Sequence, residues 1–421
     1  MTGDLPDIKD IYRRSFIIGS GFFTVALIEP MYSAYIPLML ADHLQSSVKV
    51  GAVLSALNLI APLVIPIFAA LSDRTSTRIG KRMPYIIAFL PPAALALAFV
   101  PVAAQLHLSW LVGALVVMNF LRHAARGPVV SLMPDLVPPN QRSQANGVIN
   151  TMGGLAAITA TVALAPLITV QVLIPGVGLT RRVLPFWIIA GLIIASTVFL
   201  FMNVREALAG PTPRAHTTPS LRSALSGIAR SGPGGAVPIL AAVLLWFLGW
   251  KLITPFITLY ARDYLGAGEA AAGLSFGMLA ISQTLFAVPS GIIAARLGRR
   301  RVISAALGVL TAVGAAMFAN HQLAAFSSAA GLYPFWALLF VMGLAWVVLI
   351  TNCLPMLWDL GGLGTVGLYT GLYYFASQTA LVVGPGIGGA VIEYIGYGGL
   401  FVGFAAVMLG ARMLIKDRPT A

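Results

Sequence analysis

The chain has 421 residues, of which 58% are hydrophobic and only 9% are charged. A mean hydropathy of +0.90 excludes an ordinary soluble domain, in which about a quarter of the residues are charged. The formal net charge of +13 suits either a nucleic-acid partner or a membrane protein with one basic side, and the placement of the basic residues decides between the two.

Apolar runs of about 20 residues recur along the chain, and each can cross the roughly 30 Å hydrocarbon core of a bilayer. In the first half they lie at 16–40, 50–71, 83–104, 109–133, 146–170 and 184–203. The stretch 204–236, rich in Pro, Gly and Ser, is typical of a cytoplasmic linker. The second half has runs at 237–261, 269–294, 301–320, 332–358, 366–392 and 396–415. The sequence therefore predicts an all-α membrane protein with twelve transmembrane helices, six within 1–203 and six within 237–421.

The start of the chain and its cysteine content add two expectations. Asp4, Asp7 and Asp10 precede the first apolar run, which has full spanning length, so no cleavable signal peptide is expected. The single cysteine, Cys353, lies inside a predicted span, and one cysteine cannot form an intramolecular disulfide.

The basic residues are unevenly divided between the two sides of the predicted topology. With the N-terminus inside, the inner loops and termini hold 19 Lys and Arg residues and the outer loops hold 4. This positive-inside bias predicts a multi-pass protein of the cell (inner) membrane with both termini in the cytoplasm. The basic residues therefore serve topology and contact with anionic lipids of the bilayer, and no nucleic-acid partner is expected.

A short stretch between the second and third spans, "LSDRTSTRIGKRMPYI" (71–86), holds five charged residues. The stretch "PSGIIAARLGRRRVI" (289–303) occupies the equivalent place in the second half. Two six-span halves with a repeated charged loop predict a parallel internal repeat, as in one large class of transporters. Membrane anchoring alone would explain the basic residues, but it does not call for Asp73.

The stretch 71–86 resembles the signature loop of the major facilitator superfamily, in the form typical of its sugar:cation symporter branch. That branch contains glycoside–pentoside–hexuronide carriers and sucrose-transporter-like proteins. Residues 126–154, which begin "RGPVVSLMPDL", and 343–389, which contain "TGLYY", resemble further stretches of the same branch. The resemblance covers the chain apart from the linker. It implies two six-helix bundles around a central cavity lined by spans one, four and seven, and transport by alternating access.

The resemblance also implies that the charged loop latches the cytoplasmic side closed. Asp73 would face the N-terminal end of the eleventh span near Thr365, where a helix end favours a carboxylate by roughly 0.3–1 kcal/mol. Arg74 or Arg82 would pair with Asp135 at the end of the fourth span. The predicted latch residues are Asp73, Arg74, Gly80, Arg82, Asp135 and Arg142.

An ion gradient is the expected source of energy, because the sequence has no G-x-x-x-x-G-K-[ST] motif for ATP. Of the 13 acidic residues, only Glu29 lies near the middle of a span, where a carboxylate is costly unless it is paired, protonated or facing water. The second span has no acid, unlike the sodium-coupled members of the branch, which favours protons. Glu29, Arg126 and His123 are therefore the predicted proton-coupling residues. A structural ion pair at Glu29 and a packing role for His123 are the alternatives.

Three basic residues lie within spans: Arg122, Arg126 and Lys251. Arg122 and Arg126 are one helical turn apart and share a face. Against the charge of Glu29 the three leave a formal surplus of +2 at membrane depth. Either Lys251 relieves it by losing its proton or extending to the outer surface, or the ligand supplies negative charge. The family implies a neutral sugar, whereas a sugar acid, organic acid or phosphate-bearing solute fits the charge balance.

The remaining binding candidates are aromatic and amide side chains on spans expected to line the cavity. Aromatic rings and amide donors suit the apolar faces and polar edges of pyranose rings or flat organic ligands. Ordinary helix packing is the alternative for each of them. The predicted substrate-binding residues are Tyr32, Tyr35, Asn119, Arg122, Arg126, Trp250, Lys251, Gln283, Asn352, Tyr373 and Gln378.

We therefore expect a monomeric secondary transporter that imports a small polar solute, such as a sugar or glycoside, together with protons. No grouping of metal ligands or of a nucleophile with a base occurs in the sequence, so no enzyme, cofactor or metal is expected. Transport of an anionic solute and efflux of an amphipathic compound are alternatives. A further alternative is a transporter-like assembly factor for pigment-binding membrane complexes, which would dispense with Glu29 and the cavity aromatics.

Overall fold

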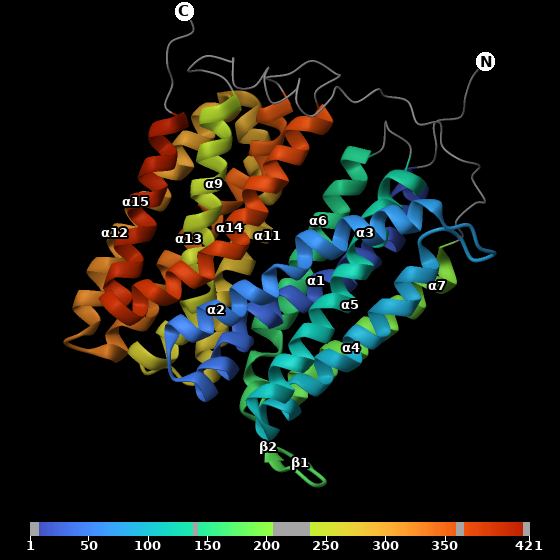
Figure 1. Ribbon diagram of the computed structural model, residues 1–421. Coiled ribbons are helices and arrows are strands. Elements are labelled where there is room, and N and C mark those ends of the chain that lie inside the picture. Colours follow the sequence, from blue (N-terminus) through green and yellow to red (C-terminus); the bar gives the residue numbers. More distant parts are fainter. Residues whose placement is uncertain (1–7, 138–141, 205–235, 359–365, 416–421) are drawn as a thin grey trace, which may run out of the picture. The chain divides into compact units, whose positions relative to one another are not determined.

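The structure, a computed structural model, describes residues 8–137, 142–204, 236–358 and 366–415 of the chain (Figure 1). These residues are almost entirely helical, and their only sheet is a short antiparallel hairpin of β1 (Val172–Ile174) and β2 (Gly178–Thr180). By their contacts they form two compact units. Unit 1 holds the described residues of 1–43, 57–212 and 269–277, and unit 2 holds those of 44–56, 213–268 and 278–421.

Unit 1 consists mainly of helices from the first half of the chain. These are α1 (Ile8–Leu44), the end of α2 (Ser47–Asn58), α3 (Ile60–Arg74), α4 (Met83–Leu106), α5 (Leu108–Leu136), α6 (Arg142–Ile158) and α7 (Val183–Asn203). After α6 the chain continues as a π-helical turn, η2 (Thr159–Ala163), and a 3-10 turn, η3 (Ala165–Thr169). The hairpin of β1 and β2 then leads into α7.

Unit 2 consists mainly of helices from the second half. These are α9 (Ala236–Ile253), α10 (Ile257–Leu259), most of α11 (Glu269–Leu297), α12 (Arg299–Ala324), α13 (Ser328–Trp358), α14 (Val366–Ile395) and α15 (Tyr397–Ile415). A 3-10 turn, η4 (Thr254–Phe256), separates α9 from α10, and a π turn, η5 (Tyr260–Tyr264), follows α10. Pro255 lies in η4, where the ring removes a backbone donor and interrupts the regular helix.

The described helices confirm the membrane fold expected from the sequence. Eleven helical segments among them are long and apolar enough to cross a membrane, such as Met83–Leu106 for the predicted run 83–104. The predicted run 146–170 instead corresponds to a shorter apolar helix, Val148–Ala163, whose last five residues form the π turn η2.

The two units repeat the same packing in the same order. In unit 1 the third span, α4, packs against the fourth, α5, and the sixth, α7. In unit 2 the third span, α12, likewise packs against the fourth, α13, and the sixth, α15. This correspondence supports the parallel internal repeat that the two charged loops predicted.

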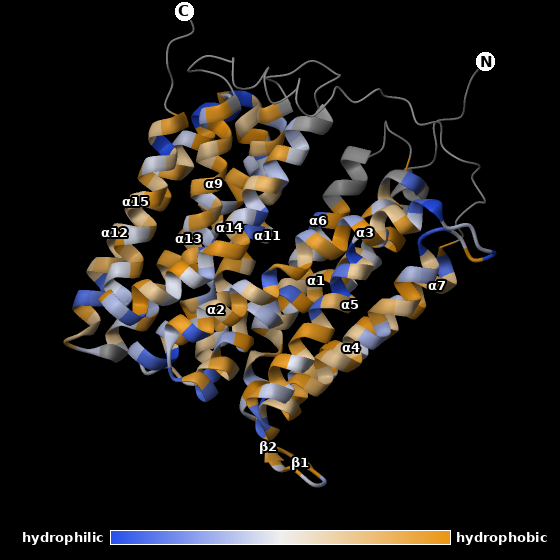
Figure 2. Ribbon diagram, viewed as in Figure 1, coloured by the Kyte–Doolittle hydropathy of each residue, from blue (hydrophilic) through white to orange (hydrophobic). Residues whose placement is uncertain are grey.

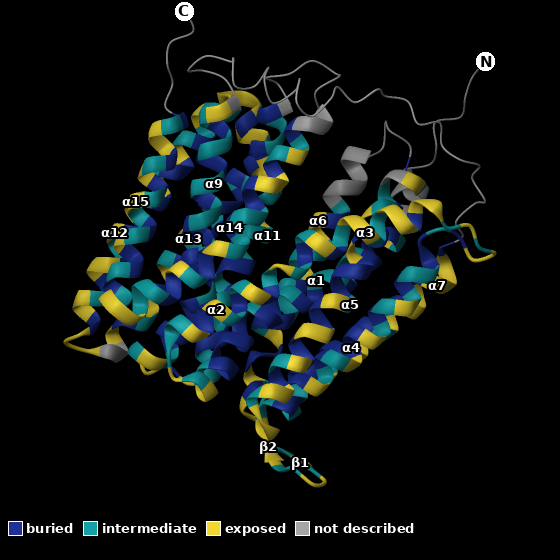
Figure 3. Cartoon of the chain, viewed as in Figure 1, coloured by how far each residue is buried: buried dark blue, intermediate teal, exposed yellow. Residues whose placement is uncertain are grey.

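Each unit has a packed apolar core, and its outward helix faces are also apolar. Hydrophilic residues lie mainly at helix ends and loops (Figure 2). Large side chains such as Leu63 and Leu95 are 64% and 63% exposed, and exposed positions run along the helices of both units (Figure 3). Faces of this kind are unfavourable in water but suit contact with lipid chains.

Helices α2 and α11 do not keep to one unit. Residues 47–56 of α2 belong to unit 2, whereas its last residues and α3 belong to unit 1. Residues 269–277 of α11 belong to unit 1, whereas the rest of α11 belongs to unit 2. The sequence division into 1–203, a linker at 204–236 and 237–421 stays a prediction, and it gave no sign of these two crossings.

Candidate functional site

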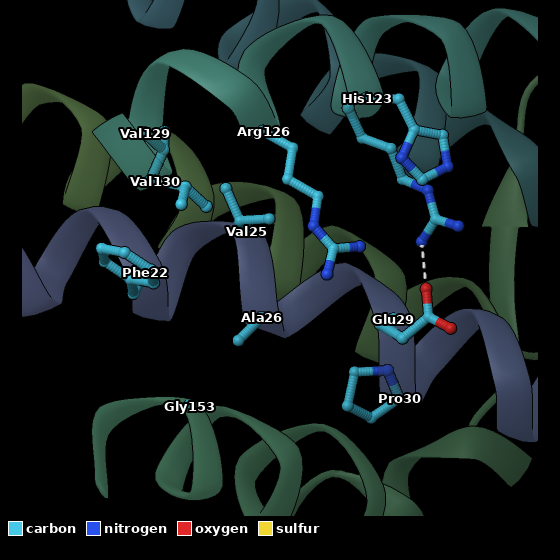
Figure 4. Close-up of a pocket in the computed structure, with 11 residues that line it drawn as sticks. Phe22, Val25, Ala26, Glu29, Pro30, His123, Arg126, Val129, Val130 and Gly153 are labelled. Atoms are coloured by element: carbon cyan, nitrogen blue, oxygen red, sulfur yellow. Dashed lines mark hydrogen bonds and ion pairs between the residues drawn. The ribbon is translucent and has the colours of Figure 1, made fainter. Parts of the chain in front are cut away.

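A cavity of about 340 Å³ lies in unit 1 between α1, α5 and α6 (Figure 4). Four of its eleven lining residues have polar side chains, and the other seven are apolar residues, glycine or proline. The polar residues are Glu29 from α1 and Arg122, His123 and Arg126 from α5. The others are Phe22, Val25, Ala26, Pro30, Val129, Val130 and Gly153. The cavity therefore contains every proton-coupling residue that the sequence predicted.

An ion pair joins the two helices across this cavity. Arg122 Nη1 donates a hydrogen bond to Glu29 Oε2 at 2.7 Å. The Arg122 side chain is 7% exposed, whereas that of Glu29 is 45% exposed. The Arg122 guanidinium also lies over the ring of Tyr32, 4.9 Å from its centroid, which is a cation–π contact. Arg122 is therefore fixed on two sides, and the carboxylate of Glu29 borders the open space.

Arg126 and His123 complete the polar lining on α5. Arg126 is four residues after Arg122 and extends from α5 toward α1 (Figure 4). The His123 ring is buried, and its Nδ1 has no hydrogen-bond partner among the described residues. Two guanidinium groups and one carboxylate give the lining a formal charge of +1 when His123 is neutral.

Three other predicted residues of unit 1 lie beside the cavity or away from it. The Asn119 side chain is buried and donates to the Leu115 carbonyl on its own helix at 2.8 Å. The hydroxyl of Tyr32 is near that amide but makes no standard hydrogen bond among the described residues. Tyr35 is fully buried and its ring packs against Phe186 at 6.4 Å, so it contributes to packing.

The predicted residues of unit 2 include an aromatic cluster. The rings of Trp250 and Trp346 stack at 4.1 Å with an interplanar angle of 9°. Phe247 meets Trp346 edge-on at 5.2 Å and Tyr373 at 5.7 Å. Tyr373 and Trp250 are both largely buried. The apolar ring faces thus mostly contact one another.

The other predicted residues of unit 2 lie on α9, α11, α13 and α14. The Asn352 amide donates to the Val348 carbonyl at 2.9 Å within α13. Gln378 Oε1 is buried without a hydrogen-bond partner among the described residues. Lys251 and Gln283 are partly buried on α9 and α11. The expected convergence of these groups with Glu29 stays a prediction.

The charged loop of residues 71–86 is centred on Arg82. Its Nε donates to Asp135 Oδ2 at 2.9 Å, its Nη1 donates to the Ser72 hydroxyl at 2.6 Å, and its Nη2 forms an ion pair with Asp73. Burial lowers the pKa of Arg82, but the hydrogen bonds and charges of Asp135 and Asp73 outweigh it and raise the pKa overall. Arg82 is therefore permanently charged and joins the loop to α3 and α5.

Of the other predicted latch residues, the structure describes Arg74 and Gly80 in full and Arg142 without its side chain. Arg74 is exposed, and Arg82 is the arginine that pairs with Asp135. Gly80 has φ +113°, a conformation that favours glycine, in a turn closed by its N–H donating to the Thr77 carbonyl at 3.1 Å. Arg142 begins α6, but its side chain and the expected Asp73 partner near Thr365 lie outside the described residues.

The sequence reasoning missed a second charged cluster in unit 1, around Arg182. Arg182 Nε and Nη2 donate to the two carboxylate oxygens of Glu269 at 2.8 and 2.6 Å, and Nη1 donates to Asp42 at 2.7 Å. Burial lowers the pKa of Arg182, and hydrogen bonds and charge from Glu269 and Asp42 raise it overall. The acidic residues at the ends of the spans are visible in the sequence. The sequence does not show which span ends lie close together in the fold, so their pairing with Arg182 could not be predicted.

The chain has the architecture of a membrane transporter of the major facilitator type. The model of the family described as MFS/sugar transport protein matches residues 17–409, and the chain belongs to this family. It is therefore a transporter rather than an enzyme. Among the described residues no three His, Cys, Asp or Glu side chains are grouped to hold a metal ion.

A curated relative matches only a short part of the chain. It is the inner membrane transport protein YajR of Escherichia coli (strain K12), which is 34% identical over 65 residues, or 15% of this chain and 14% of YajR. So short a match says nothing of the activity of the whole chain.

Solved structures resemble the whole fold at low sequence identity. A variant of the nucleoside transporter NupG has a TM-score of 0.71 at 13% identity, over 96% of this chain and 98% of that one. A bacterial homologue of the iron transporter ferroportin, in its inward-facing state, has 0.64 at 15% over 97% and 98%. The human organic anion transporter MFSD10 (TETRAN) has 0.59 at 16% over 96% and 99%. At these identities the likeness shows the fold alone.

Proposed function

We propose that the chain carries a small polar solute through the inner membrane by alternating access and couples this movement to protons at Glu29. The observation that supports the proposal is the ion pair between Glu29 and Arg122 at 2.7 Å on the wall of a cavity. A carboxylate at membrane depth is costly without such a partner, and this one also borders open space. If Glu29 served helix packing alone, its carboxylate would not need to border the cavity.

The pair has the properties of a proton switch. Both partners line the cavity, but Glu29 is the more exposed of the two, so a proton can reach it from there. Protonation would neutralise the carboxylate and weaken its hold on Arg122, while the Tyr32 ring keeps the guanidinium in place. His123 is the second candidate, because its buried Nδ1 has no hydrogen-bond partner among the described residues.

The size of the cavity supports a solute of about the size of a sugar. Its volume of about 340 Å³ lies at the lower end of the range for small-molecule sites, roughly 300–1,000 Å³. The family description supports a sugar or a related compound. The similar solved structures are of transporters for a nucleoside, iron and organic anions by their titles, so the fold does not select the cargo.

We also propose that both termini lie in the cytoplasm, on the side of the 19 basic loop and terminal residues, and that the chain works as a monomer. The cluster around Arg82 would then lie at the cytoplasmic side, where it can help to hold the closed state. The assembly-factor alternative is disfavoured, because it gives no reason for a charged cavity.

Reconstitution into liposomes with a pH-sensitive dye inside tests the proposal. A panel of sugars, glycosides and small acids is added outside, and inward movement of solute with protons acidifies the interior. Glu29→Gln should abolish the acidification and leave downhill solute exchange measurable, because the amide resembles the protonated acid but cannot release a proton. Asp263→Asn, a change of an acid near the exposed end of η5, is the matched control.

Two results would contradict the proposal. Persistent acidification in Glu29→Gln would move the coupling site elsewhere, and His123→Gln would be examined next. A panel from which no solute enters would remove the case for a small polar cargo.

A further inference from the structure

We infer that the cargo of the unit 1 cavity is a small monoanion, such as a carboxylate-bearing sugar or hydroxy acid, that binds best when Glu29 is protonated. The inference rests on the proposed function, because it names the chemical class of the solute that the same cavity carries. It uses the formal charge of the lining, the positions of its two arginines and the burial of Arg122.

The lining has one more positive group than negative groups. Arg122 and Arg126 carry two positive charges and Glu29 carries one negative charge, whichever partners each of them contacts. The remaining lining residue with a polar side chain is His123. A surplus of positive charge at membrane depth is unfavourable, and an anion in the cavity lowers it by one.

The arrangement of the two arginines suits an anion. They lie four residues apart on α5, so both face the same side of the helix, and Arg126 extends toward α1 (Figure 4). The buried Arg122 uses Nη1 for Glu29, and its buried Nε has no hydrogen-bond partner among the described residues. A guanidinium can hold a carboxylate with two parallel hydrogen bonds.

His123 and Tyr32, the other titratable groups beside the pair, do not remove the surplus. His123 is buried between two arginines on its own helix, so a proton on it would add to the positive charge. Tyr32, on the helix of Glu29, lies under Arg122 and is uncharged in its ordinary form. From the described side chains of α6 the lining receives Gly153.

Protonation of Glu29 should therefore strengthen binding of an anion. It changes the formal charge of the lining from +1 to +2 and frees Arg122 for a second carboxylate. One proton and one monoanion together then restore the original charge, so the two bind as a neutral pair. Affinity for the anion should rise as the pH falls, by up to about tenfold per pH unit for one linked proton. A neutral solute gains nothing from the added charge.

Calorimetry on the purified full chain tests this without a membrane. The probes are two pairs that differ in a carboxylate: D-glucuronate with D-glucose, and L-lactate with propane-1,2-diol. The acid of at least one pair should bind at least about tenfold more tightly than its neutral counterpart, and more tightly near pH 6 than near pH 8. Glu29→Gln should bind the acid near pH 8 as tightly as the natural chain does near pH 6.

Variants of Arg126 test whether its guanidinium binds the carboxylate of the acid. Arg126→Gln should lower the affinity for the acid by about tenfold or more, which corresponds to the loss of one charge-assisted hydrogen-bonded pair. Arg126→Lys should recover part of the loss, because it keeps the charge without the planar fork. Arg296→Gln, in the exposed last turn of α11, is the matched control and should change nothing. Thermal unfolding of each variant shows that it is folded.

The inference is overturned if neither acid binds, or if each neutral probe binds as tightly as its acid. It is also overturned if Glu29→Gln leaves acid binding near pH 8 unchanged or weaker. A neutral sugar that drives protons into liposomes would leave the proposed function intact and remove only this inference. Acid binding that depends on Arg126, without any proton movement, would remove the coupling and keep the anion site.

Discussion

Arg122 and Glu29 contribute unequally to their ion pair. The arginine is buried and in contact with the ring of Tyr32, whereas nearly half of the glutamate side chain is exposed. A change of protonation or of partner therefore affects the glutamate first, and the guanidinium keeps its position. In a transport cycle the arginine would be the fixed reference and the carboxylate the changing group.

The ring of Tyr32 should matter more than its hydroxyl. Tyr32→Phe keeps the face under Arg122 and removes a hydroxyl that makes no standard hydrogen bond in the described part of the chain, so stability should hardly change. Tyr32→Leu removes the cation–π contact and should cost about 0.5–2 kcal/mol. Thermal unfolding and the liposome assay measure both effects. Equal losses in the two variants would assign the effect to the hydroxyl.

The sequence predicted the charged residues of the cavity but not their pairing. Counting charges within the apolar runs was enough to select Glu29, Arg122 and Arg126, since few charges occur there. Which arginine donates to Glu29 depends on the rotation of α5 against α1 and on side-chain conformation, and neither leaves a trace in the sequence. For the same reason Tyr35 was a binding candidate, although its ring packs against Phe186.

Arg82 organises the charged loop between α3 and α4. Its donors reach Ser72 and Asp73 near the end of α3 and Asp135 at the end of α5, so one side chain connects two helices and the loop. In the sequence Asp73 stood out as the central residue, because an acid within a basic cluster is unusual. The structure instead shows a buried arginine surrounded by more exposed acids.

Replacing Arg82 should therefore be more damaging than replacing Asp73. Arg82→Gln leaves Ser72, Asp73 and Asp135 without their donor and should lower the free energy of unfolding by about 1–3 kcal/mol. Asp73→Asn keeps the bond between Arg82 and Asp135 and should fold normally, but it should weaken the latch proposed for the cytoplasmic side. Arg78→Gln, an exposed change in the same loop, is the control.

Unfolding midpoints would measure the effects on stability. Labelling of single cysteines introduced into the cavity, from each side of the membrane, would measure the effect on closure. A larger loss in Asp73→Asn than in Arg82→Gln would contradict the central role of the arginine.

At the scale of the whole molecule, two helices begin in one unit and continue in the other. Residues 269–277 of α11 belong to unit 1, where Glu269 is held by Arg182. Residues 47–56 of α2 belong to unit 2, where Glu393 accepts hydrogen bonds from the Ser47 N–H at 2.7 Å and the Val48 N–H at 3.3 Å. A carboxylate at a helix N-terminus is electrostatically favourable. Each crossing segment therefore has a charged anchor at its first turn.

Arg182→Gln should loosen the first turns of α11. It removes two hydrogen bonds to Glu269 and one to Asp42, and hydrogen exchange of residues 269–277 should become faster by about tenfold or more. Arg182→Lys should recover only part of the protection, because it lacks the fork that matches the carboxylate. Arg181→Gln, at the exposed neighbouring position, is the control. Unchanged exchange in Arg182→Gln would mean that packing alone holds this segment.

The sequence predicted the spans and the repeat because both depend on patterns along the chain. The length of an apolar run and the distribution of basic residues are readable one segment at a time. The crossings of α2 and α11 depend on which helices meet, and an apolar helix carries no signal of its neighbour. The pairs of Arg182 with Glu269 and of Glu393 with Ser47 join residues 87 and 346 positions apart.

Cys353 is fully buried in α13 and is the only thiol of the chain. Oxidants and alkylating reagents in solution cannot reach a side chain in that position. The natural protein therefore behaves as a thiol-free background, into which one new cysteine per unit can be introduced for a fluorescent or spin label. Distances between such labels, recorded with and without a bound solute, would show whether the two units move, with no native thiol removed from the chain.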